Sequence, residues 1–334
     1  KQMLDSSNPL SQLDIAKRIL SDDRTESLTA FGEVGLTLAR NTPIPELTKK
    51  EINRNTWQRL VKIANEYNQP GKFTTFPAYE WTSSPAEVNH EPTYARNMHR
   101  NVIYRSEKVS EVPFSSFDSQ DPENLWAWLD KERAKGIDVM AIPHNANMSN
   151  GLMYDAKTKS GKALTASYAQ TRSRNEPINE VVQIKGQSMT HPVLSPNDEF
   201  ADYESWDKAN LSMVFPKNND MLEFEYARSA LKNGLAFGQS LGVNPYEFGM
   251  IGSTDSHTSL ATADEDNFFG KMTSAEPAAG RGGKPYFPVE NDSGIPLQQW
   301  ESLASGYAAV WASENTREAL FPPSFQVQLY IAWR

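Results

Sequence analysis

The sequence predicts an α/β fold in which strands alternate with helices along most of the chain. Short apolar runs with strand character lie at residues 137–142, at 180–184 and around 248–252, and each ends in polar or small residues. A predicted helix at 122–135 precedes the first run, and another at about 219–239 lies between the second and the third. This alternation favours a parallel sheet or a barrel, and 334 residues are enough for one α/β barrel or two smaller domains.

Ordinary start and stop signals bound the elements of the first half of the chain. Residues 1–70 are mostly helical in pattern, and a proline–glycine pair ends the last of these helices. Short strands follow at 73–81 and 101–104. The clearest helix begins after Asp121, which can cap it, and Gly136 provides its exit.

The second half continues the pattern with one long interruption. Residues 258–296 are rich in Gly, Pro, Asp and Ala and are expected to form a long surface excursion. A last strand at 307–311 and a helix that begins at Glu314 follow it. The chain contains no internal repeat and no low-complexity segment.

Composition excludes several classes of protein. The net charge of −9 provides no cationic field for nucleic acid or for an anionic membrane surface, so neither is expected as a partner. No apolar run is long enough to span a bilayer. The absence of cysteine excludes disulfides, thiolate nucleophiles and Cys-ligated metal sites. It fits the cytoplasm and the periplasm alike, so the compartment stays open, with the periplasm slightly favoured.

Acid and imidazole side chains follow three of the predicted strands. Asp255 and His257 come two positions apart after the run that ends near residue 252. Glu80 is at the end of one earlier strand, and His144 comes just past the end of another. In parallel α/β folds the carboxyl ends of the strands form the functional face. Carboxylate and imidazole ligands together suit zinc, iron or manganese, so the sequence predicts a metal site at this face.

Each of these residues also has a structural interpretation. Glu80 alone is equally well explained as an ion-pair partner, and His144 after a proline can simply cap a following helix. His99 stands at the start of a strand, so the rule about strand ends does not select it. His90 and His191 lie in loop-like sequence and are expected to be surface or structural residues.

Basic side chains near these positions are candidates for binding an anionic substrate. Arg100 and Arg105 can pair bidentately with phosphate or sulfate, although a solvated face is the default interpretation of their cluster. Lys185 follows another strand and is likewise a candidate for binding an anionic substrate. The stretch 252–255 is not a Gly-x-Ser-x-Gly elbow, so serine hydrolase chemistry is not expected there. The chain has no Walker loop and no Gly-x-Gly-x-x-Gly motif, so nucleotide-cofactor chemistry is not expected either.

Several stretches of the chain, in the order in which they occur, resemble one bacterial family. The stretches that contain candidate ligands or basic residues are 77–82, 99–105, 142–145, 183–186 and 252–257. They resemble the proteins that carry domain of unknown function 3604, which are related to the PHP (polymerase and histidinol phosphatase) metal-dependent phosphoesterases. The resemblance extends from about residue 1 to about residue 320. It implies an α/β fold of a particular kind, a distorted (β/α) barrel with seven strands.

The resemblance also implies a cluster of two or three divalent metals, with Mn, Zn or Fe expected and Ca or Mg as alternatives. Glu80 would bridge two metals, His99 and His144 would each bind one, and Asp255 with His257 would complete the cluster. A metal-bridging hydroxide would then attack a small anionic ester, which would be a phosphoester, a phosphonate ester or a sulfate ester. Glu80 and Asp255 would be the catalytic residues.

The chain departs from the family pattern at three places. It lacks the His-x-His and Asp-His motifs with which the family opens, and Met189 stands where an acid is expected. Residues 321–334 do not resemble the family. The expectation is therefore a partial barrel over residues 1–320 with a divergent tail, weak metal binding and poor activity. The alternative is a catalytically silent PHP-like barrel that serves as a binding or scaffold domain, and the oligomeric state stays unknown.

Overall fold

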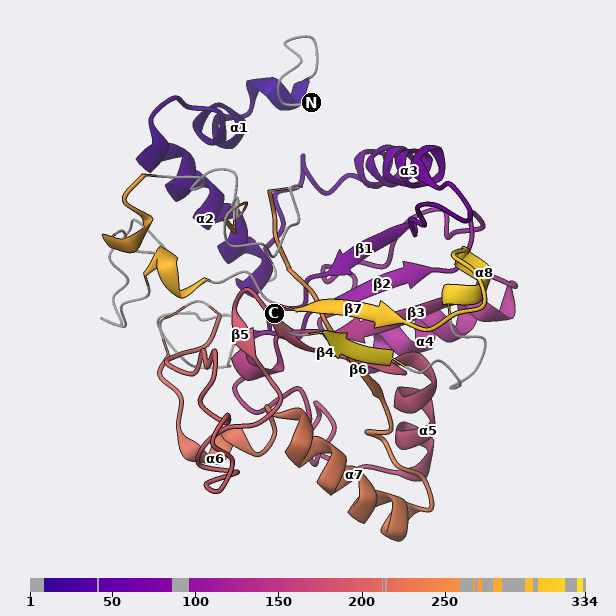
Figure 1. Cartoon of the computed structure of the whole chain (residues 1–334). Helices are drawn as coiled ribbons and strands as arrows, with labels where there is room; N and C mark the ends of the chain where they lie inside the picture. The colour runs from indigo at the N-terminus through magenta and orange to yellow at the C-terminus, as the bar shows by residue number, and fades with distance from the viewer. Residues whose placement is uncertain are drawn as a thin grey trace.

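The structure is a computed structural model. It describes residues 9–40, 42–85, 96–211, 213, 215–258, 267, 270–271, 279–283, 298–302, 306–321 and 329–332. His90, most of the predicted excursion at 258–296 and most of the tail at 321–334 lie outside the described residues. Figure 1 shows the strands in the middle of the molecule, with α3 beyond β1 on one side and α7 on the side of β4 and β6.

The helices follow their predicted positions closely in the first half of the chain and less so in the second. The α-helices are α1 Asp14–Ile19, α2 Arg24–Arg40, α3 Lys50–Tyr67, α4 Pro122–Ala134, α5 Ala166–Asn175, α6 Asn219–Leu222, α7 Ala227–Leu241 and α8 Arg317–Leu320. Short 3-10 helices are η1 Pro9–Gln12, η2 Ala146–Met148, η4 Arg281–Gly283 and η5 Gln299–Glu301. The cap predicted for α4 is confirmed, because the Asp121 side chain accepts a hydrogen bond from the Glu123 amide at 3.0 Å.

The single helix predicted at about 219–239 is wrong, because the chain leaves the helical path between α6 and α7. Glu225 lies in this break and is fully buried. Its Oε1 accepts hydrogen bonds from Lys217 Nζ at 2.6 Å and from the Gly151 amide at 3.2 Å. A buried carboxylate requires such partners, so these tertiary contacts override the local helical pattern.

The strands form three small sheets. In the first, β1 Ala78–Trp81, β2 Arg100–Tyr104 and β3 Val139–Pro143 pair antiparallel in the order β1-β2-β3. In the second, β4 Ile178–Gln183 lies between β5 Gly186–Gln187 and β6 Gly249–Gly252, and β4 is parallel to β6. The third pairs β7 Tyr307–Val310 with β8 Leu329–Ala332, antiparallel. β3 lies next to β4, and β6 lies next to β7 and β8.

The expected distorted seven-stranded (β/α) barrel is therefore wrong. Such a barrel needs parallel strands joined by crossover helices. Among the described residues only β4 and β6 are paired in parallel, and the ladder from β1 to β3 reverses direction at every step. The α/β composition predicted from the sequence is correct at the coarser level, since helices and strands alternate in a mixed arrangement.

One apolar core fixes the first sheet against α3 and α4. Its buried members are Trp57, Trp81, Val102, Tyr104, Leu125, Trp126, Leu129, Ile137, Val139 and Ala141. The ring of Trp57 packs on Tyr79 and Tyr104 at centroid distances of 5.7 and 5.4 Å. These contacts anchor β1, β2 and β3 together, so the residues at their ends are held in fixed relative positions. In the described part of the chain, no helix is both long and apolar enough to cross a membrane.

Candidate metal centre

Strand direction brings three candidate ligands to one edge of the first sheet. β1 and β3 both run opposite to β2, so their carboxyl ends lie beside the amino end of β2. Glu80 is the next-to-last residue of β1, His144 directly follows β3, and His99 directly precedes β2. The His144 amide donates a hydrogen bond to the His99 carbonyl at 3.4 Å, which continues the ladder to this edge.

The three side chains converge on a single oxygen atom. Glu80 Oε1 lies 2.8 Å from His99 Nδ1 and 3.0 Å from His144 Nε2. One ligand atom from each residue lies within 4.8 Å of the other two. Two imidazoles and one carboxylate form a donor set that proteins use for zinc and for non-haem iron. The residues therefore fit a divalent cation in their chemistry and in their spacing. The described side chains of Asp255 and His257 do not belong to this group of three.

Burial and hydrogen bonding set the charges of the three ligands. Burial alone would raise the pKa of the Glu80 carboxyl, but the hydrogen bonds from His144 and His99 outweigh it and hold that pKa well below its usual range. Burial lowers the pKa of His99, although Glu80 opposes this. Burial also acts to lower the pKa of His144, but its hydrogen bond to Glu80 raises it overall. An ionised carboxylate and a neutral imidazole are the forms that bind metals.

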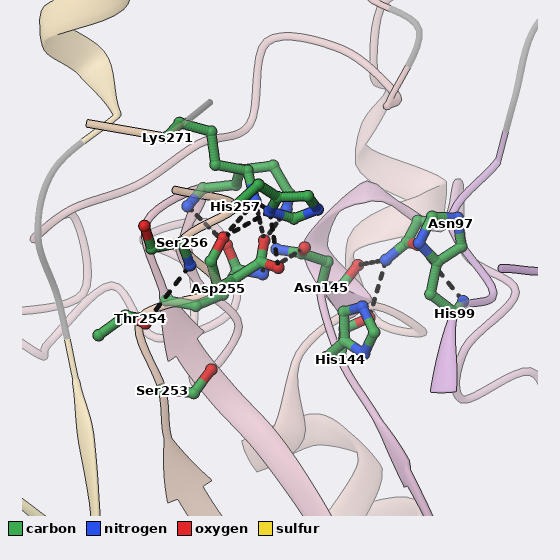
Figure 2. A network of polar contacts seen from close by, with 12 residues as sticks. Asn97, His99, His144, Asn145, Ser253, Thr254, Asp255, Ser256, His257 and Lys271 are labelled. Carbon is green, nitrogen blue, oxygen red and sulfur yellow. Dashed lines mark hydrogen bonds and ion pairs between the residues drawn. The ribbon is translucent and has the colours of Figure 1, made fainter. Parts of the chain in front are cut away.

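Neighbouring polar groups hold the two imidazoles in place. Ser84 Oγ lies 2.9 Å from His99 Nε2, the ring nitrogen that faces away from Glu80. The Asn97 side chain donates to the carbonyls of His144 at 2.8 Å and Asn145 at 2.9 Å, as Figure 2 shows. Such outer partners commonly orient metal-binding histidines.

Asp255 and His257 form a second group with two lysines. Asp255 Oδ2 accepts hydrogen bonds from Lys271 Nζ at 2.7 Å and from Gln183 Nε2 at 2.7 Å, and it also contacts Lys185 Nζ. Lys271 Nζ lies 2.6 Å from His257 Nδ1. Burial would raise the pKa of Asp255, but the two ammonium groups hold it well below its usual range. Burial and the adjacent Lys185 lower the pKa of Lys271 to about 7.

Gln183 and Asn145 connect the two groups. Gln183 Nε2 donates both to Asp255 Oδ2 and, at 2.5 Å, to Asn145 Oδ1. Asn145 directly follows His144 and has a left-handed backbone conformation with φ of 52°. Figure 2 shows Asn145 between the Asp255 group and the side chains of His144 and His99. The Glu80–His99–His144 cluster and the Asp255 group are therefore neighbouring parts of one polar region.

The predicted substrate-binding residues lie in three different environments. Lys185 belongs to the Asp255 group, so its role in binding an anion stays a prediction. Arg100 is fully buried, and its Nε lies 2.9 Å from Glu176 Oε1. Arg105 follows the far end of β2 and pairs with Asp138 at 3.2 Å. Both arginines thus pair with acids outside the Glu80–His99–His144 cluster, and their role in binding an anion also stays a prediction.

Sequence reasoning missed several polar residues of this region, namely Ser84, Asn97, Asn145, Glu180, Gln183 and Lys271. Gln183 and Asn145 lie at the ends of predicted strands, so the rule about strand ends could have selected them. Lys271 lies in sequence without periodicity, and nothing local marks it. His191, expected to be a surface or structural residue, is buried, and its Nε2 lies 2.9 Å from Asp207 Oδ2.

The structure thus defines a mixed α/β protein with a His-His-Glu cluster of metal-ligand type. The chain belongs to the family described as a protein of unknown function (DUF3604), which it matches over residues 3–326. None of the curated proteins matches the chain. None of the solved structures matches it either.

A buried acid beside this region is expected to make stability depend on pH. Glu180 is 3% exposed, its Oε2 accepts a hydrogen bond from Ser253 Oγ, and burial raises its pKa to about 7. Between its ordinary value of 4.5 and about 7, the folded protein keeps a proton that the unfolded chain has lost. The free energy of unfolding therefore falls by about 3 kcal/mol as the pH rises through that window.

The replacement Glu180→Gln removes the titrating group and is expected to flatten this decline. Urea unfolding at pH 5, 6, 7 and 8 with a chelator present would give the free energies of wild type and variant. The exposed residue Glu247 provides the control replacement Glu247→Gln, which should leave the decline unchanged. Parallel pH profiles for wild type and Glu180→Gln would contradict the prediction.

Proposed function

We propose that this chain is a divalent-metal-dependent hydrolase that acts on a phosphoester, a phosphonate ester or a sulfate ester. The observation that carries the proposal is the convergence of His99 Nδ1 and His144 Nε2 on Glu80 Oε1. The three residues supply ligand atoms within 4.8 Å of one another, at one edge of the first sheet. A relation to the PHP phosphoesterases belongs to the same proposal. It is supported by the ordered sequence motifs and by this donor set.

In the proposed site, the three side chains would hold the cation and Lys185 and Lys271 would attract the anionic group of the ester. A bound divalent cation would lower the pKa of water and polarise the ester oxygen. The two ammonium groups converge on Asp255, which positions them before a substrate arrives. Glu80 and Asp255 are the carboxylates that we expect catalysis to require.

The contacts of Asp255 bear on the number of cations that we propose. Two or three cations, as the family resemblance implies, would need Asp255 and His257 as additional ligands. In the structure the ammonium groups of Lys185 and Lys271 contact that carboxylate, so a second cation would compete with them. We therefore propose one cation held tightly by Glu80, His99 and His144, with any second cation held more weakly.

A binding or scaffold function without catalysis is the second candidate. It is favoured by the same contact, since lysines neutralise the Asp255 carboxylate and tie up the group that hydrolysis would use. The two candidates differ in a measurable way. Both allow a bound metal, but only the first gives turnover.

The proposal is tested with two buried histidines that each contact an acid. His144 is 2% exposed and contacts Glu80, whereas His191 is 8% exposed and contacts Asp207 outside the site. The chain, His144→Gln and His191→Gln would be loaded with Mn²⁺, Zn²⁺, Fe²⁺ or Ca²⁺. Bound metal would be measured by mass spectrometry. Hydrolysis would be measured with phosphate, phosphonate and sulfate esters as substrates.

We expect His144→Gln to lose bound metal and turnover, and His191→Gln to keep both. Equal metal content in both variants would remove the proposed centre. Metal binding by the wild-type chain with no hydrolysis of any ester would favour the binding function.

A further inference from the structure

A large cavity adjoins the candidate metal centre through Glu80. Its volume is about 730 Å³, and Glu80 forms part of its wall together with the neighbouring β1 residue Tyr79. β1 is the edge strand of its sheet, so the cavity lies where no further described strand covers it. Proteins bind small organic ligands in cavities of roughly 300–1,000 Å³, so this space is large enough for one.

The wall of the cavity is mainly apolar. Its large apolar members, from the N-terminal segment, α3 and the loop before α4, include Leu10, Leu20, Leu47, Ile52, Leu60 and Phe117. Among the described residues that line it, only Glu80 and Arg59 carry a charge. A ligand that fills this space would therefore present mainly apolar surface, and its anionic group would pair with Arg59 or with a cation held at Glu80.

One face of α3 points to the cavity instead of the core. Ile52, Thr56 and Leu60 line the cavity and are spaced four residues apart, so they form a single stripe on the helix. Trp57 also reaches the cavity wall but is 2% exposed and packs in the core. Leu60 is 47% exposed, although it lies one turn along α3 from the core residue Trp57. An apolar side chain kept accessible in a concave surface is typical of a ligand pocket.

The N-terminal segment completes the pocket from the other side. Leu20, which directly follows α1, lines the cavity and is 43% exposed. Two leucines from separate segments, Leu20 and Leu60, thus leave apolar surface accessible around one space. Burying that surface against an apolar group would release about 25 cal/mol for each Å².

We propose that this cavity binds the apolar part of the ester substrate, an aryl or bulky alkyl group, while its anionic group lies at the Glu80–His99–His144 cluster. The inference rests on the proposed function, because it places the reacting ester at that cluster. It narrows the substrate class to esters that combine a phosphate-like or sulfate-like group with a large apolar substituent. Small anionic esters would fill only the charged end of the site.

The inference is tested with two stable phosphonates that differ only in their apolar group. Phenylphosphonate and methylphosphonate would be titrated calorimetrically into the metal-loaded chain. Neither carries an ester bond, so binding is measured without turnover. We expect phenylphosphonate to bind at least about tenfold more tightly, because the buried ring adds apolar contact.

Variants of α3 locate the preference in the cavity. Leu60→Trp and, independently, the exposed-site replacement Thr56→Trp would take up part of the space and are expected to reduce the tenfold preference. Ile63→Trp provides the matched control, since Ile63 is on the same helix and 38% exposed but does not line the cavity. The control should keep the wild-type preference and the wild-type metal content.

The outcomes separate this inference from the proposed function. Equal binding of the two phosphonates to wild type, or no binding of either, would overturn the inference. The proposed metal centre would still be tested separately, by the metal content of the chain and its His144→Gln variant. A preference that both Trp variants leave unchanged would overturn it as well. So would a change of oligomeric state in Leu60→Trp with an unchanged preference, because the cavity would then be a contact between copies of the chain.

Discussion

Replacing Glu80 with Gln is expected to remove bound cation and ester hydrolysis together. Glu80 Oε1 is the atom on which both imidazoles converge, so it is the common point of the candidate centre. Gln keeps the size of the side chain but removes the negative charge that offsets the charge of a divalent cation. Changes to groups that only support metal ligands cost 10–100-fold in affinity, so loss of a ligand should cost at least about 100-fold.

The measurement is metal content after dialysis, with competition by a chelator to obtain the affinity. Glu66→Gln provides a matched control, since Glu66 lies on α3 with a side chain 56% exposed and contacts only Lys62 among its described ion-pair partners. The control is expected to retain wild-type metal and activity. Glu80→Gln with wild-type metal content would show that the cluster is a hydrogen-bonded group of structural residues.

Replacing Arg100 with Met is expected to cost about 3 kcal/mol of folding stability, because it breaks a buried ion pair. The Arg100 and Glu176 side chains are 0% and 3% exposed. The variant leaves the Glu176 carboxylate buried with fewer partners. Arg172 Nε at 3.3 Å and Trp126 Nε1 at 2.7 Å remain in contact with it, which limits the loss to the lower end of the range for such pairs.

Urea unfolding of wild type, Arg100→Met and Arg105→Met measures this effect. Arg105 pairs with Asp138 at the surface, where the two side chains are 28% and 57% exposed, so its replacement should cost less than about 1 kcal/mol. A stable Arg100→Met protein with impaired binding of phenylphosphonate would support the substrate-binding role predicted from the sequence. Equal stability losses in the two variants would contradict the difference in burial.

The sequence predicted the candidate ligands but not the strand arrangement that brings three of them together. Glu80 and His144 were predicted as ligands from their positions at strand ends. In the structure Glu80 Oε1 lies 3.0 Å from His144 Nε2. His99 could not be selected in this way because it precedes its strand. It reaches the site only because β2 runs antiparallel to its neighbours, and strand direction depends on pairing between distant segments. The same reversal makes the predicted parallel barrel wrong.

Local alternation could have predicted the burial of Arg100. Arg100, Val102 and Tyr104 are two residues apart along β2 and are all buried, so the arginine shares the apolar face of its strand. The contact between Lys271 and Asp255 could not have been predicted from the local sequence. Lys271 is 16 residues from Asp255, in sequence that lacks periodicity, so the salt bridge between them depends on the tertiary fold.

The position of β1 at the edge of its sheet links cation binding to local unfolding. Among the described strands only β2 pairs with β1, so fraying of β1 would carry Glu80 away from the two imidazoles. A cation shared by Glu80, His99 and His144 would act as a cross-link between the ends of three strands. Ligand that binds only the closed arrangement shifts the equilibrium toward it, so protection of the β1 amides from hydrogen exchange should increase with free cation concentration. The outermost strand of the sheet would then be ordered most firmly when the centre is loaded.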